Sequence, residues 1–199
     1  MIEVIFLDIR TLSFLTLIFS FIYGVGLIIY AINNFRFKGI KTVALGFLSL
    51  SIGTLLFSLR QYLSDYFTII IANTLIFLHL IFIYQGLIKF CHLTVGKEKY
   101  TYLLLLAIML ISFHYYLYIA PQINMRIVIF SFCLAVQSFL CTKALQTNTN
   151  PVYKSQTKMM SYLFFCIGLF HLYRMIFMIG KASINDFMIA GIIHSLTVI

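Results

Sequence analysis

The stretch GLFHLYRMIFMI at residues 168–179 places His171 and Arg174 inside an almost wholly apolar run. Residues three apart lie on one face of a helix, so the imidazole and the guanidinium would point the same way. An arginine at the centre of a membrane helix costs about 2.5–3.5 kcal/mol on insertion scales, and less near an end. We therefore expect Arg174 either to bind an anionic or carbonyl-bearing ligand, or to form a packing clamp with Asn73 or Asp186.

Other polar side chains are expected at the same level of the membrane. Arg60 ends the second apolar run, Asn73 lies about two turns inside the third, and Arg126 lies about one turn inside the fifth. We predict that Arg174, Asn73, Arg60, Arg126 and His171 form an outward-opening, ligand-binding polar set. The membrane setting favours an amphipathic ligand with a polar head. The alternative for Arg60 and Arg126 is that their long side chains simply reach the interface.

Three histidines permit a different chemistry. His79, His171 and His194 fall near mid-depth of the third, sixth and seventh apolar runs, and two facing histidines can ligate haem or a metal. No H-x-x-E-H or H-E-x-x-H spacing accompanies them, so we expect no metal site and no cofactor, with haem as an alternative. A transporter or channel is a further alternative, although its inner half would offer only Gln85, Gln137 and Lys143 as polar candidates.

The composition places these residues in a membrane. Hydrophobic residues make up 62% of the 199-residue chain and charged residues only 10%, against about a quarter charged in soluble domains. Apolar runs near the ~20 residues that a bilayer requires lie at 9–32, 40–60, 66–91, 100–119, 122–146, 157–180 and 184–199. We predict an all-α polytopic bundle of seven transmembrane helices, forming one domain over residues 1–199.

The basic residues predict an orientation. Nine of the fourteen lie in the first, third and fifth connections: Arg36, Lys38, Lys41, Lys89, Lys97, Lys99, Lys143, Lys154 and Lys158. Because cytoplasmic loops are rich in Lys and Arg, we expect the N-terminus outside and the C-terminus in the cytoplasm. The same rule accounts for the net charge of +9 without a nucleic-acid partner. The last run would span only ~24 Å of a ~30 Å core, so we expect truncation within the seventh helix.

Three segments carry a resemblance: LDIRTLSFL (7–15), TVALGFLSLSIGTLLFSLR (42–60) and SDYFTIIIANTLIFLHLIFIYQGLIKF (64–90). They resemble the N-terminal multi-helix membrane region that precedes GGDEF domains in many bacterial diguanylate cyclases. The matching positions are Asp8, Arg10, Thr11, Ala44, Gly46, Phe47, Gly53, Arg60, Ala72, Asn73, Leu75, Gly86, Leu87, Phe90 and Arg174. The resemblance covers most of the chain and is strongest over residues 7–90.

This resemblance implies a multi-pass sensor in the bacterial inner membrane that regulates a cytoplasmic cyclase by rearranging a homodimer. No GG-D/E-E-F signature occurs in the chain, so we expect no enzymatic activity in this fragment. The leading hypothesis is therefore a signal-input domain in contact with membrane lipid and an amphipathic or anionic small molecule. A transporter or channel subunit and a haem-binding redox protein remain the alternatives.

Overall fold

The structure is a computed structural model that describes residues 9–34, 38–92, 98–147 and 154–179. These ranges hold six helices that are long and apolar enough to cross a membrane, and no strand. In chain order the elements are α1 (Ile9–Asn33), α2 (Ile40–Ser58), η1 (Tyr66–Ile71), α3 (Ala72–Phe90), α4 (Glu98–His114), η2 (Tyr115–Ile119), α5 (Ile123–Gln146) and α6 (Lys154–Ile179). The predicted all-α class and six of the seven expected helices are confirmed, whereas the run at 184–199 lies outside the described residues.

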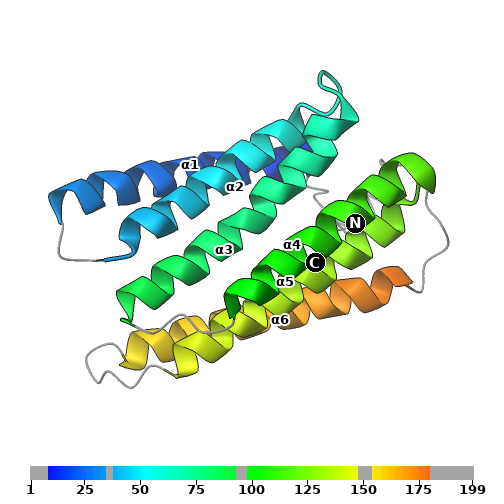
Figure 1. Ribbon diagram of the computed structural model, residues 1–199. Coiled ribbons are helices and arrows are strands. Elements are labelled where there is room, and N and C mark those ends of the chain that lie inside the picture. Colours follow the sequence, from blue (N-terminus) through cyan, green and yellow to red (C-terminus); the bar gives the residue numbers. More distant parts are fainter. Residues whose placement is uncertain (1–8, 35–37, 93–97, 148–153, 180–199) are drawn as a thin grey trace, which may run out of the picture.

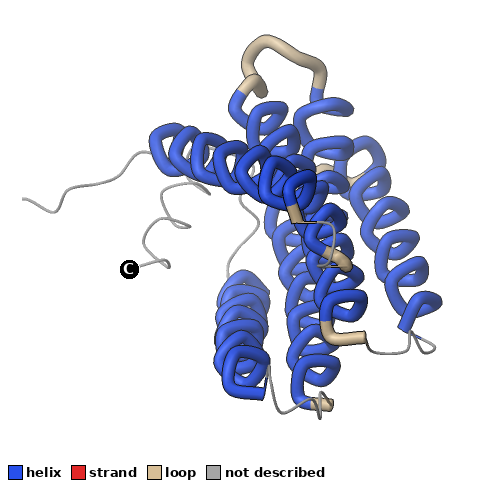
Figure 2. The backbone as a smooth tube through the Cα atoms, turned by 90° about the vertical axis from the view of Figure 1, so that its left-hand side faces the viewer, coloured by secondary structure: helices blue, strands red, loops and turns tan. Residues whose placement is uncertain are grey.

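Backbone chemistry explains why the apolar runs are helical. A chain in hydrocarbon must satisfy every N–H and C=O within the segment, which a helix does. The helices end where local residues interrupt that pattern. Ala120, before Pro121, adopts non-helical dihedrals of φ −130° and ψ 78°, as expected because proline disfavours helical geometry in the preceding residue. Figure 2 shows that the described residues outside the helices form short loops at the helix ends.

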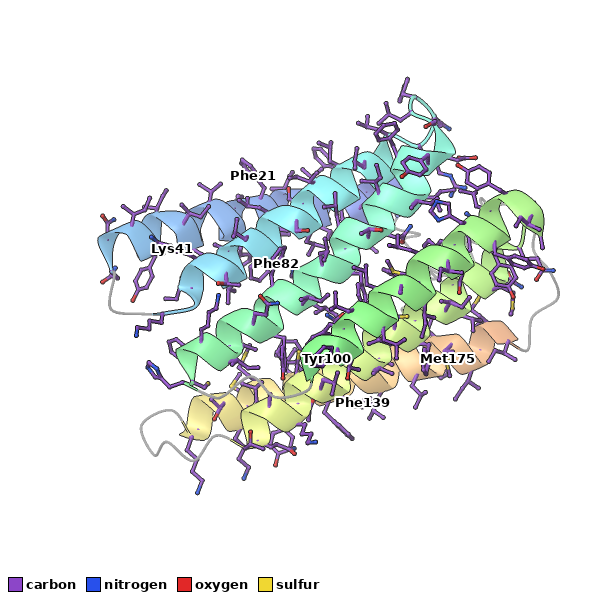
Figure 3. The ribbon with its side chains drawn as sticks, viewed as in Figure 1. Phe21, Lys41, Phe82, Tyr100, Phe139 and Met175 are labelled. Atoms are coloured by element: carbon purple, nitrogen blue, oxygen red, sulfur yellow. The ribbon has the colours of Figure 1, made fainter. Side chains whose placement is uncertain are left out.

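Successive helices run up and down, so the bundle has two chemically different ends (Figure 1). The lysine end, where α1, α3 and α5 finish, carries every lysine of the described residues: Lys38, Lys41, Lys89, Lys99, Lys143, Lys154 and Lys158. The arginine end, where α2, α4 and α6 finish, carries every described arginine: Arg10, Arg60, Arg126 and Arg174. In Figure 3, Lys41 and Tyr100 mark the lysine end.

The six helices form two groups of three. In the first half α2 packs against both α1 and α3, and in the second half α5 packs closely against α6. The halves meet where α3 lies against α4 and α5 (Figure 1). No contact between α6 and the first half occurs among the described residues, so α3, α4 and α5 form the junction of the bundle.

Large side chains fill that junction. Phe77 of α3 and Met109 of α4 are fully enclosed. The rings of Phe113 and Phe130 lie 6.1 Å apart between α4 and α5. Such aromatic side chains bury much apolar area, and their offset or edge-to-face contacts add about 0.5–1.5 kcal/mol each. The junction therefore resembles an ordinary packed core rather than an open passage.

Small residues set the spacing inside the first half. A Cβ at Gly46 would lie 3.0 Å from the His79 carbonyl oxygen, and one at Gly53 would lie 2.9 Å from that of Ala72. Between these glycines, the Ser49 hydroxyl donates to the Leu75 carbonyl at 2.8 Å. Gly46, Ser49 and Gly53 thus form a stripe along which α2 packs against α3, and small residues of this kind let membrane helices approach closely.

Candidate functional site

Two arginines from different halves of the bundle come together at the arginine end. Arg60 lies in the turn after α2, and Arg126 lies in the first turn of α5. Both side chains are half-buried, and the charge of Arg60 acts electrostatically on Arg126. The Nε of Arg126 is enclosed and has no hydrogen-bond partner in the described part of the chain. Like charges within electrostatic reach repel, so an anion between them would be favoured.

One carboxylate of the protein acts on this pair. Asp65, in the turn before η1, attracts both Arg60 and Arg126. Burial lowers the pKa of Arg60 from its ordinary value, and the Asp65 carboxylate opposes that shift. Asp65 is itself exposed, so solvent weakens its attraction. The three residues Arg60, Asp65 and Arg126, called the arginine cluster below, together carry a formal charge of +1.

From the arginine cluster toward the middle of the bundle, the junction contains first the amide of Asn73 and then the aromatic rings of Phe77 and Phe130. Residues four apart share a helix face, so Asn73 lies on the same face of α3 as the enclosed Phe77, one turn nearer the arginine end. Arg126 stands in the same relation to Phe130 on α5. The Asn73 side-chain amide donates to the Ile69 carbonyl at 2.6 Å, which orients its oxygen. The polar residues Asn73 and Arg126 thus lie one helical turn nearer the arginine end than the apolar residues Phe77 and Phe130.

Two wide helical turns border this region. The π-helical segments η1 and η2 lie at the start of the third span and the end of the fourth. The first segment, η1, contacts α4, and the ring of Tyr66 lies 6.1 Å from that of His114, the last residue of α4. π-helical turns shift the register of the side chains that follow and often occur at functional sites. Tyr66 directly follows Asp65 of the arginine cluster in the chain.

Arg174 and His171 occupy a different part of the molecule. Both are half-buried on α6, which packs against α5 through Ser161 and Gly168. Arg174 follows Gly168 by six residues and therefore lies about 120° away around the helix. It sits at the edge of the packed face, and no described charged side chain acts on it. The structure thus brings Arg60 and Arg126 together, with Asn73 on an adjoining face, and leaves Arg174 and His171 apart.

The residues behind the alternative hypotheses are also dispersed. The His79 ring packs against Phe47 at 5.3 Å, and the His171 ring packs against Phe170 at 5.5 Å. His194, like Asp186, lies outside the described residues. No group of three His, Cys, Asp or Glu residues suited to a metal occurs within the described ranges.

The three polar candidates for a transport path are not arranged along one line. Gln85 and Lys143 are exposed on the outside of their helices, whereas Gln137 is fully enclosed in the junction. A path for a polar solute needs side chains that line a common interior space. These three residues therefore give no such path among the described helices.

Sequence reasoning missed three features of this end of the bundle. Asp65 was not selected, although it follows Arg60 by only five residues across a short turn and could have been paired with it. The π-helical turns at Tyr66–Ile71 and Tyr115–Ile119 have no recognisable signal in their apolar and aromatic sequences. Asn124, buried near the start of α5, was also not selected.

No protein-family model, curated protein or solved structure matches the chain. The arginine cluster is therefore interpreted from its own geometry and charge.

Proposed function

We propose that the chain is a membrane-embedded signal-input domain that binds an anionic, amphipathic ligand at the arginine cluster. The observation that carries the proposal is the meeting of Arg60 and Arg126, which belong to different halves of the bundle. Two guanidinium groups favour a carboxylate or phosphate, since their planar forks match the oxygens of either group. Within the described ranges, the carboxylate that acts on both of them is that of Asp65, which is exposed.

The surroundings favour an amphipathic ligand over a small free ion. Apolar rings, including those of Phe113 and Phe130, fill the junction below the cluster. Exposed tyrosines such as Tyr62 and Tyr118 lie at the same end, and amphipathic rings of this kind sit at headgroup level in a bilayer. A molecule with a negative head at the cluster and an apolar body among the helices or lipids would satisfy both environments.

Such a ligand would act as a signal because it touches both halves. Arg60 and Asp65 are attached to the half formed by α1, α2 and α3, and Arg126 is attached to the half formed by α4, α5 and α6. An anion held by both arginines draws the halves together at this end, whereas the unliganded cluster holds them under repulsion. A ligand shifts such an equilibrium only by its differential affinity for the two arrangements, and bridging supplies that difference.

The finer parts of the proposal rest on the sequence. The seventh crossing over 184–199, an outside N-terminus and a cytoplasmic C-terminus follow from hydropathy and from the basic connections. The inner-membrane location, the homodimer and a diguanylate cyclase as the output follow from the resemblance of residues 7–90 to such sensors. In this proposal the ligand faces the extracytoplasmic side, and the seventh helix carries the change inward.

Native mass spectrometry of the protein, released from a bilayer that contains phosphatidic acid, tests the binding. We expect the wild type to retain an anionic lipid, and Arg60→Gln or Arg126→Gln to reduce retention at least tenfold. Lys89→Gln is the matched control, because it removes the same charge at the opposite end. Equal retention by all four proteins would contradict the proposed site. Retention of inorganic phosphate in place of lipid would identify the head group alone as the ligand.

Signalling needs a second measurement on the same variants. Hydrogen exchange across η1 and η2 reports whether the two halves close when the anion binds. We expect slower exchange in both π-helical turns on adding phosphatidic acid to the wild type, and no change in Arg126→Gln. If phosphatidic acid bound without changing the exchange, the arginine cluster would be a lipid-binding site, and the proposed signalling role would be contradicted.

A further inference from the structure

The helix α5 carries polar side chains at its most deeply enclosed positions. Ser131, Gln137 and Ser138 each have no exposed surface. Neither amide atom of Gln137 has a hydrogen-bond partner within the described part of the chain, and the same holds for the hydroxyls of Ser131 and Ser138. Buried polar groups in folded proteins are almost always paired with protein atoms or ordered water, so these groups require an explanation.

The position of Gln137 follows from its neighbours along α5. One turn earlier, the Cys133 thiol donates to the Leu105 carbonyl of α4 at 3.8 Å. Residues four apart share a face, and α4 runs opposite to α5. Gln137 therefore faces the turn of α4 that precedes Leu105, which contains Tyr102. It lies in the junction of the two halves, on the lysine side of the membrane centre.

Other polar side chains reach the same level. The ring of Tyr102 lies 4.9 Å from the ring of Tyr84 on α3, and both tyrosines are buried. Three helices of the junction thus contribute a buried polar residue at one depth: Tyr84 from α3, Tyr102 from α4 and Gln137 from α5. A tyrosine hydroxyl both donates and accepts, and so does a primary amide. Together they offer the two to four partners that a buried water needs.

We infer that Gln137 is the centre of an internal water site at the junction of the two halves. Its amide nitrogen donates to water and its carbonyl oxygen accepts from water. A neutral amide cannot balance a buried ion. A larger solute is excluded by the full enclosure of Gln137 and of its neighbours Cys133 and Cys141. Water is the ligand class that fits both restrictions, and this inference is independent of any anion at the arginine cluster.

The side-chain amide can be observed directly by NMR. In lipid nanodiscs with ¹⁵N-labelled glutamine, the NH₂ signal of Gln137 is assigned by its disappearance in Gln137→Met, which keeps the length of the side chain. We expect a cross-peak between this NH₂ group and a long-lived water. Gln146, exposed at the end of α5, is the positive control for contact with bulk water. A Gln137 signal with no water cross-peak overturns the inference.

Two enclosed cysteines give a second readout, which starts from the wild type. Cys133 and Cys141 lie one turn before and one turn after Gln137, and both are fully buried. Hydroxyl radicals made by brief irradiation label buried side chains only where water is adjacent. We expect labelling of at least one of these thiols in the wild type and a several-fold decrease in Gln137→Met. Absence of label at both thiols in the wild type means a dry junction and overturns the water site.

Discussion

The two ends of the bundle carry the same sign of charge in different environments. The lysines whose side chains are described, such as Lys89 and Lys143, are exposed, whereas Arg60, Arg126 and Arg174 are half-buried. A lysine ammonium is strongly hydrated and suits an exposed position, while an arginine keeps its charge when partly desolvated and presents a fork to anions. On the basis of this difference we propose that the lysines fix the orientation in the membrane and that the arginines bind the ligand.

The ends also differ in what holds the helices. At the lysine end the backbone of α2 meets α3 directly, because a Cβ on Gly86 would collide with Val43 and with the Gly39 carbonyl. Gly39 itself has φ 97°, a left-handed conformation that glycine adopts without strain. Toward the arginine end α2 also approaches α3, through Gly53 and the Ala72 carbonyl, but beyond this contact come charged side chains and wide π-helical turns. We therefore expect the lysine end to be the rigid end and the arginine end to be the one that changes.

The largest expected effect comes from filling the glycine contact at the rigid end. Gly86→Leu places a side chain against the backbone of α2 and forces α2 away from α3. Overpacking of this kind costs about 3 kcal/mol or more, which lowers Tm by on the order of 10 °C in a chain of this size. Thermal unfolding in detergent, followed by circular dichroism, measures the shift.

Gly26→Leu is the matched control for that substitution. A Cβ at Gly26 meets no atom within 4 Å, so a leucine there would extend into lipid or detergent. We expect a Tm within about 2 °C of the wild type, since surface substitutions change stability little. A similar loss in both variants would mean that the loss does not come from the contact between α2 and α3, and the contrast in rigidity would fail.

A smaller effect is expected from the carboxylate at the arginine end. Asp65→Asn removes the negative charge that acts on Arg60 and Arg126 and leaves their mutual repulsion. Because Asp65 is exposed, the free energy of unfolding should fall by about 0.5–1 kcal/mol, which lowers Tm by about 1–4 °C. This decrease should be smaller at high salt, since salt screens exposed charges.

A double-mutant cycle shows whether the carboxylate acts through the arginines. In an Arg126→Gln background, Asp65→Asn should lower Tm by less than half as much as it does in the wild type, because the Arg126 charge that Asp65 attracts has already been removed. The cycle is read from Tm at low and high salt. Additive effects would separate Asp65 from the arginine cluster and reduce the site to two independent interfacial charges.

The fold was predictable to the extent that it depends on hydropathy and helix spacing. The run at 66–91 predicts a helix because lipid leaves an apolar chain no other way to satisfy its backbone, and the structure has Tyr66–Phe90 there. The stripe of Gly46, Ser49 and Gly53 likewise predicts a close contact, since small residues four and three apart share a face. Both are local rules that need no knowledge of the other helices.

The site was less predictable because it depends on rotation and on which helices are neighbours. Arg174 was grouped with Arg60 and Arg126 because all three are expected at the same level in the membrane. That level does not specify the direction in which a side chain points. The structure rotates Arg174 to the edge of α6, whose described contacts are with α5 alone. It also inserts π-helical turns before Asn73 and after His114, and each such turn shifts the face on which the neighbouring residues lie.

The smallest expected effect on Tm comes from a substitution at the lysine end. It tests whether an exposed, hydrated lysine contributes to lipid binding as the half-buried arginines do. The Lys89 ammonium donates to the Thr42 hydroxyl at 3.2 Å in an exposed position, a contact between α3 and α2. Lys89→Gln should change Tm by less than about 2 °C, because exposed polar contacts contribute about 0–1 kcal/mol. Its retention of anionic lipid should equal that of the wild type. If Lys89→Gln instead lost lipid as fully as Arg126→Gln, positive charge at either end would suffice for binding, and burial would not distinguish the arginines from the lysines.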